Sequence, residues 1–241
     1  PGLFSAPNVG RPRVIDASTA HRTAADWVYG FPELATAQRD AVRTAMRVTN
    51  PGCYATGAIA ILRPLVDAGL VPADFPLTLP SVSGYSGGGR SMIEAYESGV
   101  APPFEVYGLG LKHKHIPEIM KYTGLRRRPI MVPAVANFRQ GMLVQLPLHL
   151  DQLPGKPSAQ DLHQALAAHY AGSEWVTVEP ATADGKLDAA ALRDTNKLEL
   201  RVFANDGATD DFRHAVVVAR LDNLGKGASG AAVQNLKLML G

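Results

Sequence analysis

The chain has a single cysteine, and its sequence context favours chemistry. Cys53 follows Asn50-Pro51-Gly52, a strong turn signal, and opens an Ala/Ile/Leu-rich run that ends at Gly69. At the first turn of a helix, unpaired backbone N–H groups and the helix dipole favour a thiolate and could stabilise an oxyanion formed by its attack. A lone cysteine is more often a small buried hydrophobe. The turn-to-helix position nevertheless makes Cys53 a candidate nucleophile.

Two histidines flank a lysine in the segment His113-Lys114-His115-Ile116-Pro117-Glu118. Histidine titrates near neutral pH, so His115 is the candidate acid/base partner of Cys53, with His113 as the next candidate. The two histidines are also spaced like metal ligands, but no further cysteine or histidine lies near them in the sequence. We therefore predict no metal site.

A glycine-rich run, Ser86-Gly87-Gly88-Gly89-Arg90, is the third candidate. Consecutive glycines let backbone N–H groups approach an anion, and Arg90 could add positive charge. A plain glycine turn is the alternative interpretation. The run is not a Walker loop, because the spacing and the Lys-Ser/Thr ending are missing.

The composition fits a globular protein with a substantial core: 241 residues, 46% hydrophobic and 19% charged. A formal net charge of only +2 does not suggest a nucleic-acid or membrane partner. One cysteine cannot form an internal disulfide, which fits a reducing compartment, and we expect a cytoplasmic protein. We find no signal peptide, and the chain starts without Met, as if partway into a longer one.

The elements that would position these residues indicate an α+β layer, a mixed sheet with helices on one face. Val14-Ile15 is a short β-branched pair before a polar turn, and residues 142–150 alternate as a half-buried strand does. The final helix carries Val233, Leu236 and Leu240 on one stripe. We expect helices over 35–47, 53–68, 91–97, 158–171 and 229–240, and strands over 77–84, 103–111, 142–150, 176–178, 198–203 and 215–221.

Together these motifs resemble one family, the N-acetyl-gamma-glutamyl-phosphate reductases of arginine biosynthesis, in its shorter variant. Each matching segment alone is common, but they occur in the family's order along nearly the whole chain. The segments are Val14-Ile15-Asp16-Ala17-Ser18-Thr19-Ala20-His21-Arg22, Tyr29-Gly30-Phe31-Pro32-Glu33, Asn50-Pro51-Gly52-Cys53-Tyr54-Ala55-Thr56-Gly57, Ser83-Gly84-Tyr85-Ser86-Gly87-Gly88-Gly89-Arg90, His113-Lys114-His115-Ile116-Pro117-Glu118, and Asp222-Asn223-Leu224-Gly225-Lys226-Gly227-Ala228-Ser229-Gly230-Ala231-Ala232-Val233-Gln234-Asn235.

The resemblance implies an α/β protein whose α+β catalytic domain is like that of glyceraldehyde-phosphate dehydrogenase, with a mixed, mostly antiparallel sheet. It divides the chain into residues 1–52, the C-terminal remnant of a Rossmann dinucleotide-binding domain, residues 53–222, the catalytic and dimerisation domain, and residues 223–241, a closing helix. No G-x-G-x-x-G motif follows a starting strand, so roughly sixty residues of the family pattern are absent upstream of Val14. We expect a homodimer or homotetramer.

The resemblance also implies the roles of individual residues. Cys53 is the thiolate and His115 the acid/base. The implied substrate-binding residues are Ser18, Arg22, Arg90 and Gln140, although for each arginine a solvated surface position is the alternative. The implied NADP(H)-binding residues are Ser86, Gly87, Gly88 and Asn235.

The implied reaction is reduction of N-acetyl-glutamyl 5-phosphate to the 5-semialdehyde through a cysteine thioester, with release of phosphate. Three alternatives remain. A sister acyl-phosphate reductase such as aspartate-semialdehyde dehydrogenase would share the chemistry, whereas a non-catalytic fragment would not bind the cofactor. A cysteine hydrolase is disfavoured because it gives no account of residues 226–235.

Overall fold

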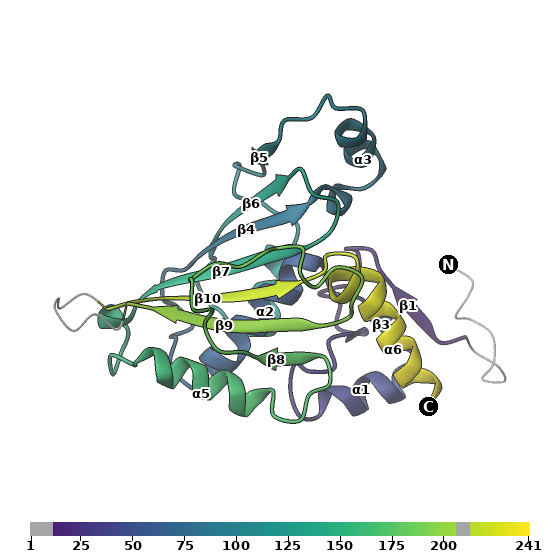
Figure 1. The fold of residues 1–241 in the computed structure, drawn as a ribbon. Helices are drawn as coiled ribbons and strands as arrows, with labels where there is room; N and C mark the ends of the chain where they lie inside the picture. The colour runs from purple at the N-terminus through teal and green to yellow at the C-terminus, as the bar shows by residue number, and fades with distance from the viewer. Residues whose placement is uncertain (1–11, 206–212) are drawn as a thin grey trace.

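The computed structural model describes residues 12–205 and 213–241, which form two β-sheets with helices packed against them (Figure 1). The smaller sheet has three strands and the larger has seven. All strands of the smaller sheet precede Cys53, and all strands of the larger sheet follow it. The division into residues 1–52, 53–222 and 223–241 stays a prediction.

The large sheet has the order β5-β6-β4-β7-β10-β9-β8. Parallel pairs join β4 to β6 and β8 to β9, and the other four neighbouring pairs are antiparallel. The mixed, mostly antiparallel sheet predicted from the sequence is therefore confirmed. The strands are β4 (Thr78–Gly84), β5 (Phe104–Val106), β6 (Ile130–Ala136), β7 (Met142–His149), β8 (Val176–Val178), β9 (Leu198–Ala204) and β10 (His214–Leu221).

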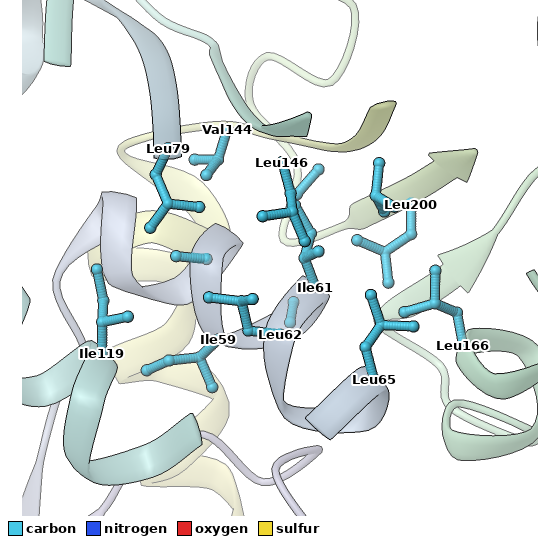
Figure 2. Packing of buried hydrophobic residues seen from close by; sticks show 14 of the residues in the cluster. Ile59, Ile61, Leu62, Leu65, Leu79, Ile119, Val144, Leu146, Leu166 and Leu200 are labelled. Atoms are coloured by element: carbon cyan, nitrogen blue, oxygen red, sulfur yellow. The ribbon is translucent and has the colours of Figure 1, made fainter. Parts of the chain in front are cut away.

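Two helices, α2 (Cys53–Asp67) and α5 (Ala159–His169), cover one face of this sheet, and α4 (Ile116–Thr123) packs against α2. The central one, α2, is apolar on nearly all sides, as a helix enclosed by other elements must be. Its side chains Ile61 and Leu65 point toward Leu146 of β7 and Leu166 of α5 (Figure 2). A Cβ added at Gly57 would lie 2.7 Å from Val144 Cγ2, so this glycine lets the helix approach the sheet closely. The core therefore fixes the first turn of α2, where Cys53 lies.

The small parallel sheet has the order β1-β3-β2 and lies beside α1 (Gln38–Thr44) and α6 (Gly230–Leu240). Its strands are β1 (Val14–Asp16), β2 (Val28–Tyr29) and β3 (Arg47–Thr49). The predicted helix over 35–47 was too long. The helix ends at Ala45, where the backbone becomes extended with ψ 144°. The chain then enters the central strand β3, in which Val48 is fully buried.

Three strands, β2, β3 and β6, were not predicted. Pro133 concealed β6, since proline is normally excluded from a paired interior strand. Here β5 pairs only with residues 134–136, so the side of β6 on which Pro133 lacks an N–H has no strand partner. The predicted strand over 103–111 was also too long, because only Phe104–Val106 pairs.

The helix predicted over 229–240 forms as α6, preceded by a π-helical turn, η3 (Gly225–Ser229). The apolar stripe Val233, Leu236 and Leu240 is exposed, whereas α6 buries Gln234 and Asn235. The remaining short elements are η1 (Tyr85–Gly88), α3 (Arg90–Glu97) and η2 (Leu150–Gln152). No helix within residues 12–205 and 213–241 is long and apolar enough to cross a bilayer.

Candidate active site

Segments far apart in the sequence line one cleft of about 740 Å³. It is lined by residues 50–54 before and at the start of α2, residues 86–89 of the glycine-rich loop, residues 113–115 before α4, and residues 227–229 of η3. Among the described residues, no aspartate or glutamate lines this cleft, whereas Arg22 and Lys114 do. The cleft therefore favours an anionic molecule.

Cys53 is the first residue of α2 and faces the cleft. Burial raises the pKa of its thiol from 9.0 to about 11. The Tyr54 backbone N–H and the positive charges of Arg22 and Lys114 oppose this shift, but burial outweighs them. The helix start favours the thiolate as expected, through the Tyr54 N–H, but burial has the larger effect, so the thiol needs a base to lose its proton.

His115, which caps the start of α4, is 3% exposed and lines the same cleft. Burial, followed by the neighbouring His113, Arg22 and Lys114, holds the pKa of its imidazole well below 6.5. The ring is therefore neutral near pH 7 and can accept a proton. Its backbone N–H donates to His113 Nδ1 over 3.2 Å, which fixes the loop that carries both histidines.

Gly52 joins the nucleophile to its candidate base. A Cβ added there would overlap His115 Nε2, Arg22 Nη1 and Glu118 Oε1, so the imidazole lies directly against the residue that precedes Cys53. The Gly52 backbone, at φ −78° and ψ 147°, is open to any residue. The lack of space for a Cβ, and not the backbone conformation, therefore requires glycine at position 52.

Behind Gly52 lies a buried ion pair between Arg22 and Glu118, with 3.0 Å between Nη1 and Oε1. Glu118 Oε2 also accepts hydrogen bonds from the Tyr29 hydroxyl at 2.8 Å and from the Gly52 N–H at 3.2 Å. Burial raises the pKa of Glu118, and Arg22 is the largest opposing influence. Arg22 additionally donates to the Asn50 and Ala17 carbonyls. This network fixes the segment that carries Cys53.

The glycine-rich run follows β4 and lines the cleft through Ser86, Gly87 and Gly88, while its cofactor role stays a prediction. Asn223 holds the run in place, since its Nδ2 donates to Ser86 Oγ over 2.9 Å. Asn223 Oδ1 accepts from the Gly141 N–H over 2.8 Å. The end of β10 therefore fixes the position of the glycine-rich loop.

Asn235, the fourth residue expected at the cofactor, does not line the cleft. It is fully buried in α6, and its Nδ2 donates to the Gly30 carbonyl over 2.8 Å and to Asn50 Oδ1 over 3.3 Å. Its Oδ1 has no hydrogen-bond partner among the described residues. In this arrangement Asn235 connects α6 to the segments that follow β2 and β3, and its cofactor role stays a prediction.

Of the four residues expected to bind substrate, only Arg22 lines the cleft. The Arg90 side chain is 92% exposed on α3 and pairs with Glu94. Ser18 is exposed and donates to Asp16 Oδ1, while Gln140 donates to Asp194 and Asp222 beside a separate, shallower hollow. The structure does not bring Ser18, Arg90 and Gln140 together with Cys53.

The cleft residues that were not singled out from the sequence include Lys114, Tyr107 and Asn223. Lys114 and Asn223 lie inside segments that carry the family resemblance, and this position was the sequence feature that could have identified them. Tyr107 had no such signal, because only the end of β5 brings it to the cleft. Among residues 12–205 and 213–241, no group of three or more His, Cys, Asp or Glu side chains could hold a metal ion.

Comparison with known proteins places this geometry in a family. A family described as "Semialdehyde dehydrogenase, dimerisation domain" matches residues 53–223. An N-acetyl-gamma-glutamyl-phosphate reductase of Burkholderia cenocepacia is 53% identical over 236 residues, covering 95% of this chain and 74% of the relative. The chain belongs to the N-acetyl-gamma-glutamyl-phosphate reductase family. A further member, N-acetyl-gamma-glutamyl-phosphate reductase 2 of Nostoc sp., is 49% identical and covers 97% of this chain and 76% of the relative.

Solved structures of another family share the fold of this N-acetyl-gamma-glutamyl-phosphate reductase family member. Aspartate semialdehyde dehydrogenase II of Vibrio cholerae, in complex with ASA, superposes with a TM-score of 0.70 at 15% identity, covering 95% of this chain and 72% of that one. The Candida albicans enzyme with NADP gives a TM-score of 0.61 at 16% identity, with coverage of 94% and 70%. At such low identity the likeness concerns the fold alone.

Proposed function

We propose that this chain catalyses the NADPH-dependent reduction of N-acetyl-glutamyl 5-phosphate to N-acetyl-glutamate 5-semialdehyde, a step of arginine biosynthesis. The observation that carries the proposal is the position of His115 Nε2 against Gly52, directly before Cys53, in a cleft that no described aspartate or glutamate lines. The 53% identity to a named reductase of this activity supports the choice of substrate over that of the aspartate enzymes, whose likeness is 15%.

In the first half of the proposed reaction, Cys53 attacks the acyl carbon of the substrate. The thiol, with a pKa of about 11, gives its proton to the neutral His115 as the sulfur–carbon bond forms. N–H groups at the first turn of α2 stabilise the oxyanion. The oxyanion then collapses, the carbon–oxygen bond to phosphate breaks, and a thioester on Cys53 remains.

In the second half, the thioester is reduced and the product leaves. A bound nicotinamide supplies the hydride for this step. The resulting hemithioacetal oxyanion reforms its carbonyl, which breaks the carbon–sulfur bond and releases the semialdehyde. The Cys53 sulfur takes back the proton held by His115, so the free enzyme is restored.

The described residues fit the nicotinamide end of such a cofactor. Gly87, Gly88 and Ser86 form one wall of the cleft, and the small residues Gly227 and Ala228 form another. The glycines of the 86–88 run carry no side chain that would block a flat ring, whereas Gly227 packs directly on Cys53. The choice of NADP(H) over NAD(H) belongs to this proposal and rests on the family.

We also propose a homodimer formed through the open face of the large sheet. The face opposite α2 and α5 carries Leu143, Phe203, Val216 and Val218, which line a hollow of about 550 Å³. The family's description as a dimerisation domain over residues 53–223 supports a second copy as the occupant. Replacement of Phe203 with Glu is expected to give monomers in sedimentation equilibrium, and an unchanged mass would exclude this face.

A cytoplasmic location completes the proposal, since a reducing compartment keeps a catalytic thiol from forming disulfides. The test of function is phosphate-dependent oxidation of N-acetyl-glutamate 5-semialdehyde with NADP+, followed by absorbance. Wild type is expected to be active and Cys53→Ala inactive; retained activity in the variant would exclude the thioester route. A chain that fails to bind NADPH at about millimolar concentration would support the non-catalytic alternative. Aspartate semialdehyde is tested in the same assay, as the substrate of the alternative sister reductase.

A further inference from the structure

The cleft contains two permanently cationic side chains, Arg22 and Lys114, and they differ in how much of their charge is available. Arg22 is buried and already donates to Glu118, to the Asn50 carbonyl and to the Ala17 carbonyl. Its charge is largely neutralised by Glu118 at 3.0 Å. Arg22 therefore has little capacity left for a substrate anion.

The positive charge of Lys114, by contrast, is available to a substrate anion. The lysine is exposed, lies between His113 and His115 at the entrance to α4, and lines the cleft. Within the described part of the chain its ammonium group makes no hydrogen bond and no ion pair. A lysine ammonium is a mobile point charge with three donors, which suits a phosphoryl group with three acceptor oxygens.

The charge of Lys114 also reaches the reacting groups. It contributes to the lowered pKa of both His113 and His115 and opposes the raised pKa of Cys53. Lys114 and Cys53 line the same cleft, so the ammonium shares this cleft with the sulfur that attacks the acyl carbon. The group that departs from that carbon is the phosphate.

We propose that Lys114 binds the phosphoryl group of the acyl-phosphate substrate and holds the phosphate that leaves when the thioester forms. The inference rests on the proposed function. Lys114 takes the place of Arg90, which lies outside the cleft, as the residue that binds the phosphoryl group. In the reverse direction the same ammonium binds the inorganic phosphate that attacks the thioester.

The first experiment measures phosphate binding without turnover, by protection of Cys53 from iodoacetamide. Inorganic phosphate is expected to slow alkylation of wild type, and Lys114→Met is expected to weaken that protection roughly 10- to 100-fold in phosphate concentration. The ratio of rates with and without phosphate cancels the effect of Lys114 on the thiol itself. Lys114→Arg should restore most of the protection.

Lys112→Met is the matched control, because Lys112 is exposed two residues earlier and does not line the cleft. It should behave as wild type. Equal phosphate protection in Lys114→Met and wild type would overturn the proposal. Protection of Cys53 by N-acetyl-glutamate is measured in the same way. If Lys114→Met loses this protection but keeps protection by phosphate, the proposal is also overturned, because Lys114 would then bind the carboxylate.

The second experiment uses the reverse reaction. Lys114→Met should raise the KM for phosphate by a similar factor and raise the KM for the semialdehyde far less. An unchanged phosphate KM would overturn the proposal. Failure of the proposed function would appear in wild type itself, as absent phosphate-dependent oxidation, while the protection experiment would still test Lys114.

Discussion

Lys226 and Glu33 form a nearly fully buried ion pair that connects η3 to the segment after β2. The Lys226 Nζ lies 3.0 and 2.9 Å from the two carboxylate oxygens, and the side chains are 1% and 9% exposed. Gln234 completes the group by accepting from Lys226 and donating to Glu33, each over 2.7 Å. The next residue, Gly227, packs so closely on the nucleophile that a Cβ would lie 2.8 Å from Cys53 Cβ. The ion pair thus holds η3 against the segment that carries the nucleophile.

Lys226→Met should therefore destabilise the protein strongly. Removing one partner leaves the Glu33 carboxylate buried without its cation, which costs about 3–5 kcal/mol in comparable pairs. The free energy of unfolding, measured by urea denaturation, should fall by that order. The double variant Lys226→Met with Glu33→Leu should recover much of the loss, because no buried charge remains.

Lys237→Met, on the exposed side of α6, is the control and should be neutral. If Lys226→Met is also neutral, the ion pair does not stabilise the folded protein. If the double variant is no better than the single one, the loss arises from packing and not from the unpaired Glu33.

Gly52→Ala should nearly abolish turnover without unfolding the chain. The added methyl group displaces His115, Arg22 or Glu118, while the backbone itself accepts alanine. Because a positioned general base contributes 100-fold or more, kcat is expected to fall by about that factor. Gly110→Ala is the control, because a Cβ there meets nothing within 4 Å. Wild-type kcat in Gly52→Ala would mean that His115 does not act from beside this position.

Alkylation of Cys53 should report its raised pKa. Since the thiol titrates at about 11, the thiolate fraction and the rate with iodoacetamide should rise about tenfold per pH unit between about pH 8 and 10. A plateau near the ordinary pKa of cysteine would contradict the dominance of burial. Cys53 is the only cysteine in the chain, so the protein mass identifies the labelled site without a variant.

Sequence reasoning succeeded where one motif specified both position and chemistry. The apolar run after Asn50-Pro51-Gly52 predicts a buried helix, and α2 confirms it with Cys53 as its first residue, although residues 50–52 form no turn and Gly52 is extended. His115 and the glycine-rich run follow from similar local signals. These are short-range patterns, and the structure brings all three to one cleft.

Sequence reasoning failed where tertiary contacts decide. The raised pKa of Cys53 depends on burial by segments as distant as η3, which no local pattern reveals. Residue type suggested Arg90 as an anion ligand, but the path of α3 points it to solvent. β6 was missed because Pro133 is tolerated only where β5 happens to end.

The two cleft histidines should make the protein sensitive to acid. Burial lowers the pKa of His113 from 6.5 to about 4 and that of His115 well below 6.5, whereas in the unfolded chain both titrate near 6.5. Below that pH the unfolded state binds more protons than the folded state, so stability falls as the pH is lowered toward about 4. Each histidine can contribute a slope of up to about 1.4 kcal/mol per pH unit.

The measurement is the free energy of unfolding from about pH 7 to 5 for wild type, His113→Gln, His115→Gln and the double variant. Each single variant should show a shallower loss of stability than wild type, and the double variant the shallowest. Because the rings lie 4.7 Å apart and each disfavours the other's charge, the two effects should not be strictly additive. Equal slopes in all four proteins would show that neither imidazole is kept neutral by the fold, and the general-base role of His115 would lose its physical support.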